Sequence, residues 1–408
     1  MDRGSCAGKL RSVGSHFGSF QDGSRPVIGH LERGVSYPFD RGHRTTPVSR
    51  RTFLQSAAAP TFISGALGPE GAGAAAPNLA PFFRTRGVVL VPSDITTWDW
   101  PRQAKRSGLT TIATHPTPHQ VAAFIKSDAG QKFLEACGRL GIEVEHELHA
   151  MRDLLPRDLF AKDPTMFRMN EKGDRTADWN LCVHSKAAMQ VVCENAVRYA
   201  RVLGPTTGRY FYWIDDGRPM CRCPRCRGLS DSDQALILEN AMLRALRPLD
   251  PRASLAHLAY ANTYGAPSQV KPAEGVFLEF APIHRNYDVP FRNRDCRFGH
   301  HTHGQLLDAL DANLAVFGSD GAQALEYWLD ESRFLRQLRM PRPPRIKIPW
   351  NRQVFRQDLE TYAKRGIRQI TTFAVKVDGQ YLKRFGRPPL DEYGSDLKRW
   401  PDLGRVRG

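Results

Sequence analysis

Residues 209–217 read Arg-Tyr-Phe-Tyr-Trp-Ile-Asp-Asp-Gly, an aromatic run that ends in two carboxylates and a glycine. Aromatic and β-branched residues favour strands, and a glycine after such a run indicates a turn, so a strand is expected at 209–215. Seven more runs of this kind lie at 87–92, 109–114, 142–149, 254–260, 275–281, 322–328 and 367–375. Segments of helical periodicity lie between them, at 121–140, 186–203, 234–246, 303–316 and 353–365. Eight strands that alternate with helices predict an α/β fold, a (β/α)8 TIM-type barrel.

The composition agrees with a folded chain of this size. Of 408 residues, 41% are hydrophobic and 25% are charged, which argues against global disorder. No run reaches the roughly 18 apolar residues that a membrane-spanning helix needs, so no membrane span is expected. The net charge of +16 would suit a nucleic-acid partner, but the arginines are scattered and form no basic stripe. We therefore expect no nucleic-acid partner, and the sequence leaves the oligomeric state open.

A segment with the features of an export signal, 49–76, lies ahead of the predicted barrel. It begins with Ser-Arg-Arg-Thr-Phe-Leu-Gln, continues with a short apolar run and ends in the small-residue stretch 72–76. This resembles a twin-arginine signal. Residues 1–48 lack periodicity and are interpreted as a disordered extension or a start assigned too early. We therefore expect a single-domain barrel in 77–408 and a periplasmic or secreted protein.

Polar side chains alternate with apolar ones in two predicted strands. The polar members are Glu143, Glu145, Glu147 and His149 in 142–149, and Glu279 in 275–281. Outward residues of a barrel pack on helices and should be apolar, so these polar residues are expected to point inward. Because burying unpaired carboxylates is costly, we interpret them as part of a site, with Glu145, Glu147 and His149 binding substrate. An internal ion-pair network with Arg or Lys is the alternative.

The predicted fourth strand runs into Asp215, Asp216 and Gly217. Barrel enzymes keep catalytic groups at the carboxyl ends of their strands. Cleavage of a glycoside needs one acid to protonate the leaving oxygen and a second group to stabilise the cationic centre. Adjacent carboxylates also repel, which would raise the pKa of one of them. We therefore expect Asp216, Asp215 and Glu279 to be catalytic; a surface Asp-Asp-Gly turn is the alternative.

Other polar or aromatic side chains fall at or near predicted strand ends. They are Asp94, His115, Trp213, His257, Tyr260 and Glu326. The aromatic run that holds Trp213 offers a surface for the apolar face of a sugar ring. We expect Trp213 and the last three residues to bind substrate, although a lone histidine on a strand is often a satisfied core residue.

Three cysteines, Cys221, Cys223 and Cys226, follow the carboxylate pair within six residues. Thiols at this spacing indicate a soft-metal site such as structural zinc, completed by a fourth ligand from elsewhere. The candidates for that ligand are Cys182, His184, Cys193 and Cys296. A disulfide within the cluster and free thiols stay open as alternatives. In each case the cluster is expected to hold a loop in place, and no cofactor is expected for catalysis.

These motifs together resemble a known family. The segments that carry the resemblance are 213–217, 221–226, 178–185, 258–260 and 277–282, and the likeness extends over 110–395. The family is a bacterial, exported domain family of long-unknown function associated with polysaccharide use, and some of its relatives are endo-β-N-acetylglucosaminidases. Many of its members carry Asn where this chain has Asp215, which favours Asp216 as the essential acid.

The resemblance implies a barrel that hydrolyses glycosides. In hexosaminidase-type barrels one carboxylate orients the 2-acetamido group, which attacks the anomeric carbon, and the other donates the proton. By position, Asp215 would orient and Asp216 would be the acid and base. Another sugar specificity, with Asp216 paired to Glu147 or Glu279, is a close alternative. A carbohydrate-binding barrel without catalysis and a metal-dependent hydrolase that uses the inward Glu and His residues complete the alternatives.

Overall fold

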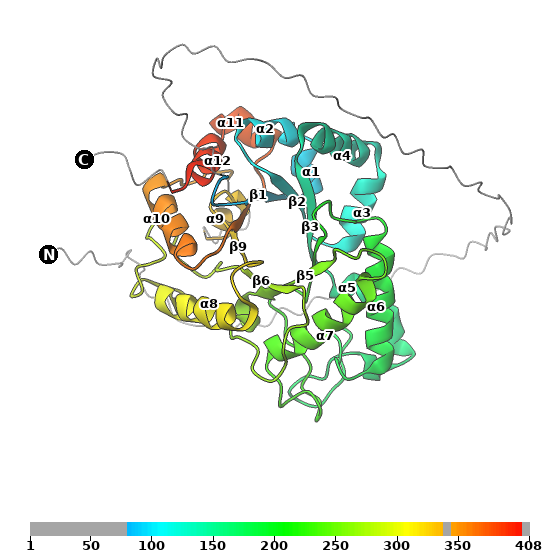
Figure 1. Cartoon of the computed structure of the whole chain (residues 1–408). Helices are drawn as coiled ribbons and strands as arrows, with labels where there is room; N and C mark the ends of the chain where they lie inside the picture. Colours follow the sequence, from blue (N-terminus) through cyan, green and yellow to red (C-terminus); the bar gives the residue numbers. More distant parts are fainter. Residues whose placement is uncertain (1–79, 338–343, 402–408) are drawn as a thin grey trace, which may run out of the picture. The chain divides into compact units, whose positions relative to one another are not determined.

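The eight predicted strands form a closed parallel barrel in the computed structural model, which describes residues 80–337 and 344–401 (Figure 1). The strands are β1 Thr85–Leu90, β2 Thr111–Thr114, β3 Glu143–His149, β4 Arg209–Trp213, β5 Ser254–Ala259, β6 Val276–Phe280, β9 Gln323–Glu326 and β10 Gln369–Phe373. The order around the barrel is β1-β10-β9-β6-β5-β4-β3-β2, and the pairing of β1 with β10 closes it. This confirms the predicted (β/α)8 barrel. The segments predicted as extension and export signal lie outside the described residues.

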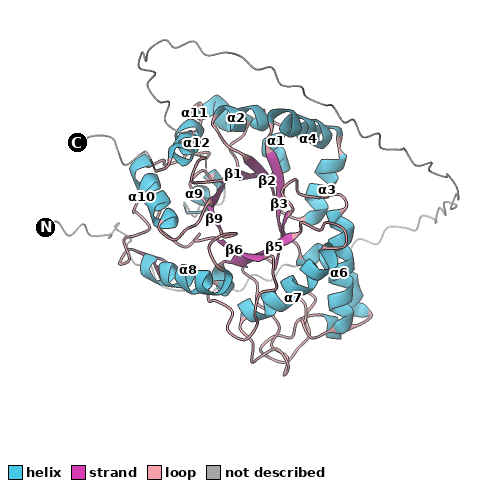
Figure 2. Cartoon of the chain, viewed as in Figure 1, coloured by secondary structure: helices cyan, strands magenta, loops and turns pink. Residues whose placement is uncertain are grey.

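Helices surround the strands, which form an inner ring (Figure 2). The helices are α1 Pro92–Ile95, α2 Trp100–Arg106, α3 Pro118–Lys126, α4 Asp128–Leu140, α5 Met151–Leu154, α6 Lys186–Ala200, α7 Asp231–Leu246, α8 His303–Phe317, α9 Glu331–Gln337, α10 Arg352–Ala363, α11 Gly379–Phe385 and α12 Leu390–Arg399. The connection from β5 to β6 carries only the one-turn 3-10 helix Ala261–Thr263, and that from β6 to α8 holds the small hairpin of β7 Arg297–Phe298 and β8 His301–Thr302.

The single helix predicted for 121–140 is two helices, α3 and α4. Ser127 lies at the break, where its hydroxyl donates to Phe124 O (2.6 Å) and accepts from Gly130 N (3.2 Å). Serine favours helix N-caps because its side chain satisfies an orphan backbone N–H. A Cβ at position 130 would lie 2.0 Å from Phe124 O, so the glycine is needed for the sharp turn.

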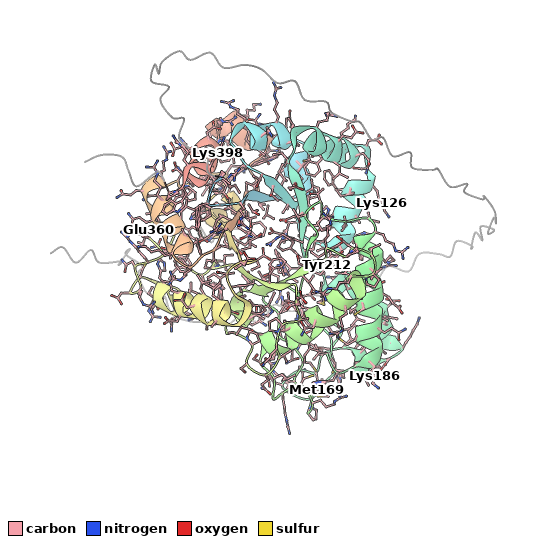
Figure 3. All side chains as sticks on the ribbon, viewed as in Figure 1. Lys126, Met169, Lys186, Tyr212, Glu360 and Lys398 are labelled. Carbon is pink, nitrogen blue, oxygen red and sulfur yellow. The ribbon has the colours of Figure 1, made fainter. Side chains whose placement is uncertain are left out.

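The apolar core lies between the strands and the surrounding helices. Figure 3 shows Tyr212 of β4 in the interior of the molecule, whereas the exposed Lys126, Lys186 and Lys398 lie at its periphery. Among the described residues, no helix combines the length and the apolar character needed to cross a membrane. Two long connections follow β3 and β4, and both bear on the site described next.

Candidate active site

An open cavity of about 180 Å³ lies at the carboxyl ends of the barrel strands. Its lining comes from every strand of the barrel or from the loop that follows it: Val91, His115, His149, Trp213, Asp216, Leu258, Tyr260, Ile283, Leu325, Tyr327, Asp330, Ser332, Phe373 and Val375. Catalytic groups of (β/α)8 enzymes lie at this face. Four of the predicted site residues, His149, Trp213, Asp216 and Tyr260, meet here.

Aromatic rings form much of the cavity wall. Trp213 lies 5.1 Å from His149 between ring centroids, and Tyr327 stacks on Phe373 at 5.2 Å and an interplanar angle of 23°. The indole Nε1 of Trp213 donates to Glu279 Oε2 at 2.8 Å, which fixes the orientation of the ring. A fixed wall of this kind can stack against the apolar face of a ring-shaped ligand.

Asp216 is the exposed carboxylate of the cavity. Strand β4 ends at Trp213, and Gly217 turns the chain with a φ of +57°, a conformation that favours glycine. The side chain of Asp216 is 66% exposed, and its Oδ1 lies 3.9 Å from His149 Nε2. The turn after the strand therefore presents this carboxylate to solvent and to the cavity.

Two histidines beside Asp216 are held by backbone carbonyl groups. His149 Nδ1 lies 2.8 Å from Ile214 O, and His115 Nδ1 lies 2.8 Å from Glu147 O. A carbonyl oxygen only accepts, so each Nδ1 carries a proton and, in a neutral ring, each Nε2 is an acceptor. Burial, together with the neighbouring His149, lowers the pKa of His115 to about 3, so its ring is neutral near pH 7.

Asp215 points away from the cavity. It is 8% exposed, and its Oδ2 lies 3.5 Å from Arg157 Nη2, while its Oδ1 accepts from the backbone N–H of Arg152 at 3.3 Å. Burial is the main cause that raises the pKa of Asp215, and the charge of Arg157 opposes it. The two adjacent carboxylates thus have different surroundings, and burial is a larger cause of the shift than their mutual repulsion.

Three of the four carboxylates predicted to point inward, Glu145, Glu147 and Glu279, lie deeper in the barrel, whereas Glu143, the first residue of β3, is exposed because it lies at the open amino end of the strand. Gln323 Nε2 is 3.1 Å from Glu147 Oε1 and 2.9 Å from Glu279 Oε1. Arg209 Nη2 donates to Gln323 Oε1 at 3.0 Å, and Arg209 Nε lies 3.5 Å from Glu145 Oε1. All three carboxyls are 0% exposed, and none lines the cavity. They form an internal network with an arginine.

Burial controls the protonation of this network. It raises the pKa of Glu279 to about 8, and together with the charge of Glu279 it raises that of Glu147. The pKa of Glu145 is also raised by burial, although Arg209 opposes the shift. Glu279 is therefore largely uncharged at neutral pH, where one guanidinium faces three carboxyls. Glu279 accepts the hydrogen bond from Trp213 Nε1 and so stabilises the position of that ring in the cavity wall.

Two of the residues predicted to bind substrate lie on the outer face of the strands. His257 Nδ1 is 2.7 Å from Glu239 Oε2 on α7, and the imidazole stacks on Phe317 at 4.9 Å. Glu326 accepts from Arg285 at 3.0 Å and from the hydroxyl of Tyr287 at 2.7 Å. Their partners come from the surrounding helices and loops, and neither residue lines the cavity.

The sequence reasoning did not select Asp330, Tyr327 and Phe373, which line the cavity. Asp330 is 2% exposed, and its Oδ1 accepts from Ser332 Oγ at 2.6 Å and from Arg333 N at 3.2 Å. It follows β9 by four residues, just beyond the predicted strand 322–328. Asp216 was predicted as a carboxylate that follows a barrel strand. Asp330 fits the same pattern once residues slightly further beyond the strand are included.

The cysteine cluster lies in the loops that follow β3 and β4. The sulfur atoms of Cys182, Cys221, Cys223 and Cys226 all lie within 4.8 Å of one another, and all four residues are buried. Of the candidates for a fourth ligand, Cys182 is thus the one that joins the group. All described cysteines are free thiols in the structure.

The model of one protein family, described as "Domain of unknown function (DUF4838)", matches residues 87–305, more than half of the chain. No curated protein matches the chain in sequence.

Among solved structures, the beta-N-acetylhexosaminidase from Bacteroides fragilis NCTC 9343 is similar at 12% identity and a TM-score of 0.48. The match covers 78% of this chain and 66% of that one, slightly less than two thirds of its length. A glycoside hydrolase family 5 enzyme from Prevotella bryantii B14, in complex with a xyloglucan tetradecasaccharide, has 10% identity and a TM-score of 0.45, over 75% of this chain and 87% of that one. A family 5 xyloglucanase from Bacteroides ovatus has 11% identity and a TM-score of 0.42, over 79% and 77% of the two chains. At such identities the similarity concerns the barrel alone.

Proposed function

We propose a glycoside hydrolase activity for this chain, which belongs to the DUF4838 family. The observation that supports the proposal is the exposed carboxylate of Asp216 in an aromatic-walled cavity at the carboxyl face of a (β/α)8 barrel. An open cavity that combines flat rings with carboxyl, hydroxyl and imidazole groups suits a sugar ring, whose apolar face can stack and whose rim hydroxyls can bind polar atoms.

In this proposal Asp216 is the general acid that protonates the leaving oxygen of the glycosidic bond. A sugar bound against the aromatic wall would exclude water from Asp216, and loss of solvation favours the uncharged, protonated carboxyl. His149 Nε2 lies 3.9 Å from Asp216 Oδ1, so a small movement of the exposed Asp216 side chain would let the imidazole and the carboxyl share a proton. Asp216 then takes a proton from the attacking water in the second half of the reaction.

The second carboxylate of the reaction is proposed to be Asp330, the other acidic residue that lines the cavity. An acetamido sugar is the favoured substrate on the strength of the sequence resemblance. Asp215 was the residue expected to orient the acetamido group, but its carboxylate faces Arg157. In the proposed site, Asp330 and the hydroxyl of Tyr327 orient the acetamido group instead.

The test is hydrolysis by the purified full chain of 4-nitrophenyl glycosides, with and without a 2-acetamido group, and of a glycan library. Asp216→Asn serves as the matched control, because it keeps the shape of the side chain and removes the acid. Glycan binding without any hydrolysis would reject the enzyme and favour a carbohydrate-binding barrel. Activity lost on chelation at an unchanged melting temperature would instead indicate a metal-dependent hydrolase.

We also propose export through the paired arginines of 49–55, which lie outside the described residues. Arg50→Lys combined with Arg51→Lys should leave the protein in the cytoplasm, since the Arg-Arg-x-Phe-Leu pattern is the feature that the export machinery reads. Cell fractionation and immunoblotting would measure this. Unchanged periplasmic accumulation of the double variant would contradict a twin-arginine route.

A further inference from the structure

We propose that Cys182, Cys221, Cys223 and Cys226 bind one zinc ion, which joins the loops after β3 and β4 and fixes the turn that carries Asp216. The metal site stands on the geometry of the cysteines alone. Only its value for catalysis depends on the glycoside hydrolase proposed above.

The spacing of the sulfur atoms fits a single tetrahedral ion. Cys182 Sγ lies 3.8 Å from both Cys223 Sγ and Cys226 Sγ. Zinc binds thiolate at about 2.3 Å, so sulfurs at the corners of a regular tetrahedron lie about 3.8 Å apart. A disulfide needs its sulfurs at about 2.05 Å, roughly half the observed separation. All four sulfurs lie within 4.8 Å of one another, which leaves room for one ion and not for a multi-iron cluster.

Hydrogen-bond donors surround the sulfurs as they do around metal-bound thiolates. The backbone N–H groups of Met169 and Cys223 donate to Cys221 Sγ at 3.3 and 3.5 Å, and His184 Nδ1 lies 3.1 Å from Cys226 Sγ. Arg175 Nη1 lies 3.8 Å from Cys221 Sγ. Four thiolates and one Zn²⁺ carry a net charge of −2, and the guanidinium and N–H donors stabilise it.

The local backbone brings three of the ligands together. The N–H groups of Cys226 and Arg227 both donate to Cys223 O at 2.9 Å, which closes the turn of the Cys-x-x-Cys segment. The fourth cysteine, Cys182, comes from the loop after β3, where its N–H donates to Met166 O at 3.0 Å. The two loops are joined directly, because the N–H of Arg222 in the loop after β4 donates to Met169 O at 2.9 Å. In Figure 3, Met169 and Lys186, at the start of α6, lie on the same side of the barrel.

Asn180 connects the cluster to the turn that carries Asp216. It lies two residues before Cys182, is 0% exposed, and accepts from Asp215 N at 2.9 Å through Oδ1. Its Nδ2 donates to Arg218 O at 3.0 Å and to Pro219 O at 3.3 Å. The Asn180 amide thus hydrogen-bonds to both ends of the Asp215–Pro219 turn. An ion bound to Cys182, two residues further along the chain, would fix the position of this amide. Asn180 is a positioning residue in this scheme.

The first experiment measures the metal content of the purified full chain by elemental analysis and native mass spectrometry. About one zinc per chain is expected, and cobalt substitution should give the visible absorption of a tetrahedral thiolate site. Cys182→Ser and Cys223→Ser should each lose the ion, whereas Cys193→Ser, on α6 and outside the cluster, should keep it. If the cluster variants do not fold, titration of the wild-type thiols with a mercurial while released zinc is measured gives the same answer.

The second experiment measures hydrogen exchange with and without metal. Removal of zinc should speed exchange in residues 166–182 and 213–226 and leave α12 unchanged. Wild-type protein without metal and with all thiols free, a mass deficit from a disulfide, or stoichiometric iron would each overturn the zinc site. Equal exchange in both states would overturn the link to the Asp216 turn. None of these outcomes depends on glycosidase activity, so failure of the metal site and failure of the proposed function are distinguishable.

Discussion

The barrel holds carboxyl groups at two levels, and their surroundings differ. At the rim, Asp216 is 66% exposed beside His149. In the interior, Glu145, Glu147 and Glu279 are 0% exposed and linked to Arg209 and Gln323. A group that exchanges protons with a ligand must be accessible to that ligand. A buried carboxyl is instead fixed by hydrogen bonds and ion pairs to its neighbours. We therefore expect the proposed chemistry at the rim, whereas the interior carboxyls hold the residues that form the cavity wall.

The largest expected effect is the loss of activity when the exposed carboxylate at the rim, Asp216, is replaced. Asp216→Asn should lower kcat on a natural glycan by about 10²- to 10⁴-fold, the usual contribution of a general acid. On an aryl glycoside with a good leaving group the loss should be much smaller, because that group needs little protonation. Steady-state kinetics on both substrates would measure the difference. Full activity on both would move the chemistry away from Asp216 and make Asp330, the other acidic residue that lines the cavity, the next residue to test.

The second effect concerns the aromatic wall. Tyr260→Ala should raise KM by about two- to tenfold with a smaller change in kcat, since aromatic contacts contribute roughly 0.5–1.5 kcal/mol. Tyr260→Phe is the matched control, because it keeps the ring and removes only the hydroxyl. An unchanged KM in the alanine variant would show that the sugar binds elsewhere. A phenylalanine variant as impaired as the alanine variant would assign the contribution to the hydroxyl instead of the ring.

The third expected effect is on the pH dependence of stability, which reports on the buried carboxyls. Burial raises the pKa of Glu279 from 4.5 to about 8, so the folded state binds a proton that the unfolded chain releases. The stabilisation is fully present below about pH 4.5 and is lost as the pH rises through about 8. Glu279→Gln mimics the protonated form, so its melting temperature should fall less than that of the wild type between pH 5 and about 9.

The exposed Glu135 on α4 supplies the control, because Glu135→Gln makes the same change of side chain outside the buried network. Parallel slopes for wild type and Glu279→Gln would contradict the raised pKa. Glu279→Gln should also keep most of the activity, because an amide oxygen still accepts from Trp213 Nε1. A loss as large as that of Asp216→Asn would erase the distinction between rim and interior.

The smallest effect on turnover is expected for Asp215→Asn. The substitution keeps an acceptor for Arg152 N but removes the charge opposite Arg157, at a cost of roughly 1–3 kcal/mol of stability. Its kcat on aryl glycosides should stay near the wild-type value, as measured beside a thermal melt. A selective loss on acetamido sugars would restore Asp215 to the orienting role that the sequence resemblance implies.

The strands, the turn at Gly217 and the cysteine cluster could be predicted from the sequence because each depends on residues close together in the chain. Alternating apolar runs and helical segments predicted all eight barrel strands, and Gly217 after an aromatic strand predicted a turn that presents a carboxylate. The inward face of β3 followed from the two-residue period of a strand. The Cys-x-Cys-x-x-Cys spacing predicted a cluster of thiols, since residues this close along the chain are also close in space.

Only the tertiary structure decided which distant residues meet. Strand period alone does not say how far along the barrel axis a side chain lies, so Glu279 was assigned to the site although it lies beneath Trp213. Asp215 and Asp216 are neighbours in sequence, yet Arg157 and Asn180, from another loop, hold one away from the cavity while the other faces it. The sequence left four candidates for the fourth member of the cluster, three cysteines and a histidine, and only the packing of the loop after β3 brings Cys182 into the group. Such contacts depend on how loops far apart in the chain pack together, and that information is not contained in any local pattern.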